Sequence, residues 1–114
     1  MKQLFFLLTI TLFFSCRHDD TVPVSEIYYP SVKNIIANNC LSCHGSAGSW
    51  AGRPTVFDTD DQITSQYELI KRVVADPVTP GPTGNRRMPQ GGMLSASDID
   101  IIVKWYEKGG KTTD

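Results

Sequence analysis

Cys40, Cys43 and His44 stand together in the run Cys-Leu-Ser-Cys-His and carry the most specific chemistry in the chain. Two thiols separated by two residues can reach the two vinyl groups on one edge of a haem and form thioether bonds with them. A histidine in the next position can place its imidazole beneath the iron as the proximal ligand. A C-x-x-C-H run is typical of c-type haem attachment, so the sequence predicts one covalently bound haem c.

The same cysteines have three alternative interpretations. A redox dithiol of thioredoxin type expects a surrounding β-α-β pattern, whereas Gly-Ser-Ala-Gly-Ser follows His44 and indicates a loop. A structural zinc site needs four ligands, and the remaining candidates, Cys16 and His18, lie far upstream. A disulfide across two intervening residues closes a short, strained ring and leaves the histidine without a role.

The start of the chain has the features of an exported bacterial protein. Residues 1–15 combine a basic start with an apolar run that is shorter than the roughly 20 residues of a membrane-spanning helix. This pattern predicts a signal peptide. Ser15 before Cys16 resembles a lipobox, although Phe13 and Phe14 depart from its usual residues. Cleavage before Cys16 and lipidation there are therefore expected, since its thiol would otherwise be an odd free cysteine.

The expected location is a bacterial cell envelope, with the protein lipid-anchored and facing the periplasm or the outer surface. Residues 16–29 show no helical or strand periodicity and predict a tether. Its acidic pair, Asp19 and Asp20, resembles the sorting stretch of surface lipoproteins, although a solvated linker also explains it. Residues 30–114 then form one domain. The net charge of −1 at pH 7 argues against a basic nucleic-acid-binding protein.

Helical periodicity recurs along this domain. Pro30 suits the first turn of a helix, and the apolar residues after it continue at helical spacing up to the haem motif. A capped helical turn is predicted at residues 58–62 and a helix at residues 67–74. The last helix is expected to have Ser95 as its N-cap and to stop at Gly109.

The remaining segments predict loops. Residues 45–54 and 77–92 are rich in glycine and proline, and a long ordered loop in a small domain often has a function. Asp100 and Lys104 are spaced to pair across one turn of the last helix. No stretch alternates as a strand does, so the sequence predicts an all-α protein. A domain of this size has a small core, so folding is expected to depend on the cofactor.

The second axial ligand decides between an electron carrier and a protein that binds small molecules at the iron. The candidates are Met88, Met93 and His18. His18 lies in the tether, which is a poor place for a rigid ligand. Met88 precedes Pro89, whose fixed φ and missing N–H stiffen the backbone where a thioether must be aimed. The sequence favours Met88, with Met93 as the alternative.

Together these motifs resemble the small monohaem class I cytochromes c, in a bacterial lipoprotein form. The matching elements are residues 40–44, Met-Pro-Gln-Gly-Gly at residues 88–92, and Leu-Ser opening a helix that carries Trp105 and ends at Gly109. They cover nearly all of residues 30–110. The resemblance implies a class I cytochrome c fold, with three to four helices wrapped around one haem and the N- and C-terminal helices crossing beside it.

The resemblance also implies His44 and Met88 as axial ligands and electron transfer as the activity. The protein is then expected not to be an enzyme, and to act as a monomer or as a subunit of a complex with redox partner proteins. A peroxidase-like enzyme would need a distal acid or base, and beyond His44 the only histidine is His18. A haem-based sensor with an open distal site and an electron-delivering subunit of a larger oxidoreductase are further alternatives.

Other side chains near the motifs have packing or surface interpretations. Trp105 and Tyr106 are expected to pack in the core, against the haem and the first helix. Trp50 is expected to be a loop residue. Arg86 and Arg87 are interpreted either as a solvated basic pair or as contacts of the haem propionates or of a docking partner. No propionate-binding pattern is predicted between residues 46 and 59.

Overall fold

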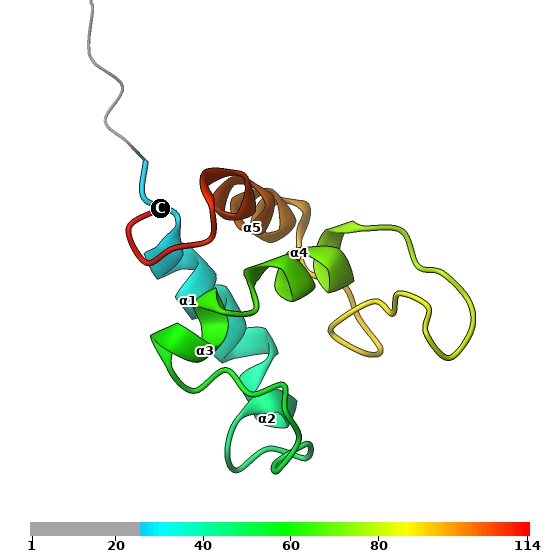
Figure 1. Ribbon diagram of the computed structural model, residues 1–114. Helices are drawn as coiled ribbons and strands as arrows, with labels where there is room; N and C mark the ends of the chain where they lie inside the picture. Colours follow the sequence, from blue (N-terminus) through cyan, green and yellow to red (C-terminus); the bar gives the residue numbers. More distant parts are fainter. Residues whose placement is uncertain (1–25) are drawn as a thin grey trace, which may run out of the picture.

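The computed structural model describes residues 26–114, in which all regular structure is helical (Figure 1). The helices are α1 (Tyr29–Asn39), α2 (Leu41–His44), α3 (Asp60–Thr64), α4 (Tyr67–Ala75) and α5 (Ala96–Lys108). The described residues thus form five helices rather than the three to four expected, because residues 41–44 form a short helix separate from α1. No strand occurs in this part of the chain, so the predicted all-α class is confirmed. None of the helices described is long and apolar enough to cross a membrane.

The predicted signal peptide and nearly all of the predicted tether lie outside the described residues, and so do Cys16 and His18. Tyr29, the last residue of the predicted tether, is the first residue of α1 and is buried. The backbone N–H groups of Tyr28 and Tyr29 both donate to the carbonyl oxygen of Asp114, at 2.8 Å each. The C-terminus therefore lies beside the start of α1 (Figure 1).

Helix α1 leads directly into α2, and the Cys-Leu-Ser-Cys-His run lies at their junction and along α2. Pro30 occupies its first turn, as predicted, where a missing N–H costs no hydrogen bond. The Cys40 N–H donates to the Ile36 oxygen at 2.8 Å, and the His44 N–H donates to the Cys40 oxygen at 2.8 Å. The buried face of α1 follows helical spacing and consists of Tyr29, Val32, Ile35 and Ile36.

Helix α5 begins and ends where its sequence signals predict. The Ser95 hydroxyl accepts a hydrogen bond from the Asp98 N–H at 3.1 Å, which satisfies one of the free donors of the first turn. Gly109 ends the helix in the left-handed conformation, with φ of 117°. The expected ion pair between Asp100 and Lys104 is present at 2.8 Å.

Trp105 joins α1, α4 and α5 in the core. It is fully buried, and its ring centroid lies 5.9 Å from that of Tyr29 and 6.3 Å from that of Tyr67. Its indole N–H donates to the Lys111 oxygen at 2.9 Å, so the polar atom is satisfied inside the core. The expected core position of Trp105 is confirmed, whereas Tyr106 is only half-buried.

The helical turn predicted at residues 58–62 begins later than expected, as α3. Its N-cap is Thr59, which forms a reciprocal capping box with Gln62. The Asp58 carboxylate instead accepts a hydrogen bond from the Ser46 N–H at 2.9 Å. Asp58 could cap a helix, but its carboxylate is engaged with the loop at Ser46. The helix therefore begins after Thr59.

Gly110 packs against Tyr67, and this contact gives a test of the core. Gly110 has φ of 69°, and a Cβ there would overlap the ring of Tyr67. We expect Gly110→Ala to lower the free energy of unfolding by about 1–2 kcal/mol for the left-handed backbone and about 1–3 kcal/mol more for overpacking. Urea unfolding of both proteins measures the loss.

Gly52 provides the matched control for this substitution. Its φ of 81° is also positive, but no atom lies within 4 Å of the position of an added Cβ. Gly52→Ala therefore carries only the backbone cost. Equal losses of stability in the two variants would contradict the packing of Gly110 against Tyr67.

Candidate cofactor site

A cavity of about 370 Å³ lies between α2, α4 and the segment around Met88. A smaller hollow of about 80 Å³ shares Cys40, His44, Trp50 and Met88 with it and adds Cys43 to the walls. The structure therefore brings together the predicted site residues Cys40, Cys43, His44 and Met88. The larger volume falls within the roughly 300–1,000 Å³ that is usual for small-molecule sites.

The walls of the larger cavity are mainly apolar. Helix α4 contributes four aliphatic side chains, and Phe57 adds an aromatic ring from the loop before α3. No Asp or Glu lines either part of the site among residues 26–114. Such a lining suits a flat, largely apolar molecule. The α4 side chains in the wall are Leu69, Ile70, Val73 and Val74.

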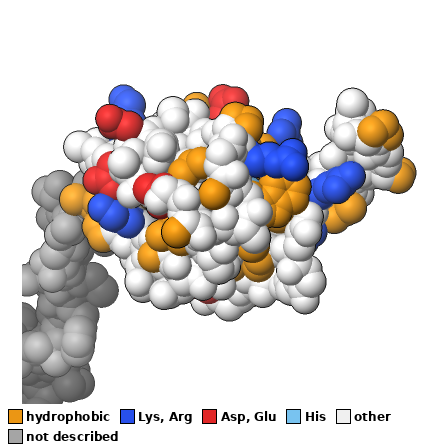
Figure 2. Space-filling view, turned by 90° about the horizontal axis from the view of Figure 1, so that it is seen from below, with side chains coloured by type: hydrophobic (Ala, Val, Ile, Leu, Met, Phe, Trp, Pro, Cys, Tyr) orange, Lys and Arg blue, Asp and Glu red, His pale blue; other side chains and the backbone are white. Residues whose placement is uncertain are grey.

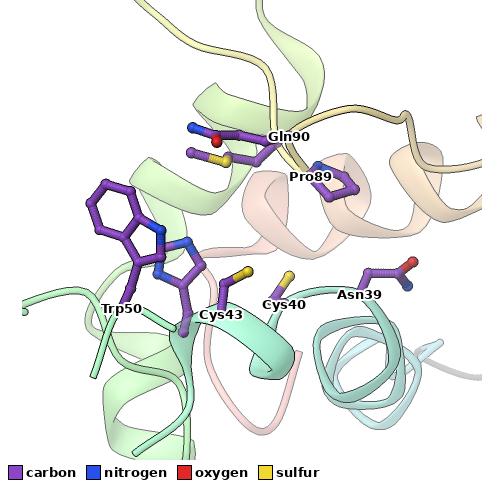
Figure 3. Close-up of a pocket in the computed structure, with 8 residues that line it drawn as sticks. Asn39, Cys40, Cys43, Trp50, Pro89 and Gln90 are labelled. Carbon is purple, nitrogen blue, oxygen red and sulfur yellow. The ribbon is translucent and has the colours of Figure 1, made fainter. Parts of the chain in front are cut away.

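Cys40 and Cys43 present their sulfur atoms to the same hollow. Figure 3 shows both sulfur atoms directed toward the chain at Pro89 and Gln90, that of Cys43 from α2 and that of Cys40 from the residue before it. Both cysteines are free thiols. Burial, with a smaller contribution from Cys43, raises the pKa of the Cys40 thiol to about 11. Because the thiolate is the nucleophile in disulfide exchange, this shift opposes the redox-dithiol alternative.

The zinc alternative requires ligands beyond the Cys-Leu-Ser-Cys-His run. Within residues 26–114, no three His, Cys, Asp or Glu side chains form a group that could hold a metal ion. The additional ligands considered from the sequence, Cys16 and His18, lie outside the described residues. A four-ligand zinc site of the usual kind therefore gains no support from this part of the chain.

The His44 ring is oriented by the segment that follows the loop. Its Nδ1 lies 3.0 Å from the carbonyl oxygen of Thr55. A carbonyl oxygen only accepts, so Nδ1 is the donor, and in the neutral ring Nε2 keeps its lone pair. The His44 oxygen in turn accepts from the Phe57 N–H at 3.0 Å. Metal-binding histidines usually carry such a second hydrogen bond, which fixes the tautomer and the ring orientation.

Met88 is held at the cavity by hydrogen bonds between the end of the long loop and α4. Its backbone N–H donates to the Val73 oxygen at 3.0 Å, and the Met88–Pro89 peptide bond is cis. The Arg87 guanidinium donates to the Val74 oxygen. Met88 is half-buried and lines both parts of the site, whereas Met93 is 74% exposed and lines neither.

Asn85 closes the same loop onto the end of α4. Its side-chain amide donates to the carbonyl oxygens of Arg72 at 2.9 Å and Pro77 at 3.1 Å. The backbone N–H of Asn85 donates to the Thr79 hydroxyl at 2.6 Å, and the backbone oxygen of Asn85 accepts from the Thr79 N–H at 3.0 Å. The loop thus donates to three carbonyls in the last turn of α4, those of Arg72, Val73 and Val74, which an isolated helix would leave free.

Trp50 and Arg53 belong to the site although the sequence did not single them out as site residues. Trp50, expected only as a loop residue, stacks on His44 with a centroid separation of 6.2 Å. The Arg53 guanidinium carbon lies 4.8 Å from the centroid of the Trp50 ring, a cation–π distance. Both residues line the larger cavity. Their stretch of sequence has no periodicity from which this position could be predicted.

Two sequence interpretations need adjustment. Arg86 is exposed, but Arg87 is half-buried and bonded to α4, so the two do not form a solvated basic pair. Trp105 packs among Tyr29 and Tyr67 and does not line the cavity. Its core role is therefore with the helices rather than with the site.

The cavity thus combines two thiols, an imidazole with a free Nε2, a thioether and an apolar wall. The thiols and the imidazole come from residues 40–44, the thioether from the end of the long loop and much of the apolar wall from α4, which are far apart in the sequence. No protein-family profile, curated protein or solved structure matches the chain. The function of the site is therefore inferred from its own residues.

Proposed function

We propose that this chain is an electron carrier of the small monohaem class I cytochrome c type, with one covalent haem c. The observation that carries the proposal is the meeting of Cys40, Cys43, His44 and Met88 around the smaller hollow, which shares Cys40, His44 and Met88 with the adjoining apolar cavity. Thiol, imidazole and thioether are the groups that c-type haem attachment and His/Met ligation require. The contact between α1 and α5 supports the class I fold (Figure 1).

Each of these residues has a distinct task in the proposal. Cys40 and Cys43 would form the thioether bonds, while His44 Nε2 and the Met88 sulfur would provide the axial ligands. A bound haem supplies one-electron exchange between ferrous and ferric iron, and a thioether ligand favours the ferrous form. The Thr55 oxygen holds the imidazole ring in one orientation. The Val73 oxygen holds the backbone of Met88.

The apolar wall from α4 excludes water and lowers the local dielectric. A carrier benefits because fewer polar groups must reorient when the charge of the site changes. The half-buried thioether at the cavity favours a filled sixth position over an open one. Among the described residues that line the cavity, no carboxylate is available as the distal acid or base of a peroxidase-like enzyme.

The lipid anchor at Cys16 and the location in a bacterial envelope are part of the same proposal. They rest on the sequence of residues 1–29 and on the expectation that C-x-x-C-H behind an export signal is a haem attachment site. The partners would be redox proteins that donate electrons to the site and accept them from it. Membrane tethering would keep the carrier near such partners.

The proposed function is tested by whether haem is covalently attached to the chain. Thioether bonds survive denaturation, so the full chain, expressed with its export signal in a host that attaches haem c, should keep its haem stain on a denaturing gel. The haem should also remain with the protein in acidified organic solvent. Haem that passes into the solvent, or a chain that carries none, would refute the proposal.

A further inference from the structure

A second hollow, of about 460 Å³, lies outside the cofactor cavity, between the end of α4 and the long loop. Arg72 on α4 and Arg86 at the end of the loop both line it. Val73 lines this hollow and the cofactor cavity alike. The two sites therefore share one wall, and a molecule bound in the second hollow would lie beside the first.

The arginines of this hollow have no acidic partner, in contrast to three lysines elsewhere on the described residues. Lys33, Lys71 and Lys104 each pair with an aspartate at 2.6 to 2.8 Å. Arg72 and Arg86 are exposed and form no ion pair within residues 26–114. The chain has a net charge of −1, so two arginines without acidic partners that line one hollow create a local positive site on a slightly acidic protein.

The loop wall of the hollow is mainly polar, and one exposed apolar side chain, Val78, directly precedes it in the chain. The paired hydrogen bonds between Thr79 and Asn85 close its base, and the loop projects from the body of the molecule (Figure 1). Val78 on this loop is 57% exposed. Figure 2 shows basic side chains beside exposed hydrophobic ones where the molecule extends. Arginine beside apolar surface is typical of protein interfaces.

We propose that this arginine hollow, formed by Arg72 and Arg86, docks a carboxylate-rich surface of a partner protein. A guanidinium group binds a carboxylate through parallel hydrogen bonds, and two such groups in one hollow match adjacent acidic side chains. Charge complementarity speeds encounter and fixes orientation without requiring tight binding. That the partner is a redox protein rests on the proposed function, because Val73 then separates the docked surface from the cofactor.

The test is a titration of the ¹⁵N-labelled, haem-loaded full chain with a hexaglutamate peptide, followed by NMR. The Nε–H signals of Arg72 and Arg86 should shift, and the shift should weaken with added salt. Arg72→Gln with Arg86→Gln should weaken peptide binding about fivefold, as expected for two exposed charge contacts. Lys33→Gln with Lys104→Gln removes the same charge from α1 and α5 and should change binding by less than about twofold.

Equal weakening by the two pairs of substitutions would overturn the proposal, since only overall charge would then matter. An anionic lipid membrane is the alternative occupant of the hollow. Vesicles of phosphatidylglycerol, with phosphatidylcholine vesicles as the neutral control, test it. Arginine-dependent binding to the anionic vesicles without peptide binding would assign the hollow to a membrane and also overturn it. The haem absorption spectrum of each variant tests the electron-carrier proposal separately from the docking proposal. A chain that lacks covalent haem refutes the electron carrier, whereas the peptide titration decides on the hollow.

Discussion

Replacing Met88 by alanine should open the sixth coordination position of the haem-loaded protein and lower its reduction potential. In the proposed site the thioether fills that position and favours ferrous iron. The weak far-red absorption band of a sulfur-ligated ferric haem should disappear, and carbon monoxide should bind the ferrous protein. The potential should fall by more than about 0.1 V, a modest part of the roughly 0.8 V range set by axial ligands.

Met93→Leu is the matched control, because Met93 is exposed and lines neither part of the site. This variant should keep the far-red band, the potential and the resistance to carbon monoxide. If Met88→Ala changes neither spectrum nor potential, another group ligates the iron or none does. The sensor and enzyme alternatives would then gain over the carrier.

Replacing both Cys40 and Cys43 by serine should remove the covalent haem and most of the stability. Without cofactor the apolar cavity of about 370 Å³ would be left open or would have to collapse. Loss of the apolar contacts that a bound haem would make there is expected to remove a large part of the roughly 5–15 kcal/mol that stabilises most domains. Haem staining and thermal unfolding measure the two losses.

Cys16→Ser is the control for cysteine replacement as such. It should keep the haem stain, since Cys16 has no part in the proposed haem site, but it should release the protein from membranes or block its processing. Stable retention of the wild type implies more than one lipid chain, because a single chain binds only marginally. A double serine variant at Cys40 and Cys43 that retains haem would contradict the thioether assignment.

The helices were the most predictable part of the fold, because their signals are local. Pro30 at the start of α1, and Ser95 and Gly109 at the ends of α5, act through their own backbone or that of near neighbours. Trp105 was expected in the core, and it is buried on α5 together with Ile102. The start of α3 was less predictable, since Thr59 and Asp58 are both good caps and a distant backbone N–H, that of Ser46, engages Asp58.

Only the site residues that belong to a recognisable sequence motif could be predicted. The Cys-Leu-Ser-Cys-His run and Met-Pro pointed to residues that do meet in the cavity. The position of Trp50 against His44 depends on a loop without periodicity. The partners of His44 and Met88 are the backbone oxygens of Thr55 and Val73. Any residue type carries such an oxygen, so no sequence pattern identifies them.

The proposed carrier exchanges electrons at a haem whose two axial positions are both filled by the chain. A potentiometric titration of the wild-type full chain, followed by absorbance and repeated under carbon monoxide, tests this arrangement. We expect one reversible one-electron transition, with a low-spin spectrum that carbon monoxide does not change. The absence of any redox-active absorbance, or rapid binding of carbon monoxide to the reduced wild type, would contradict it.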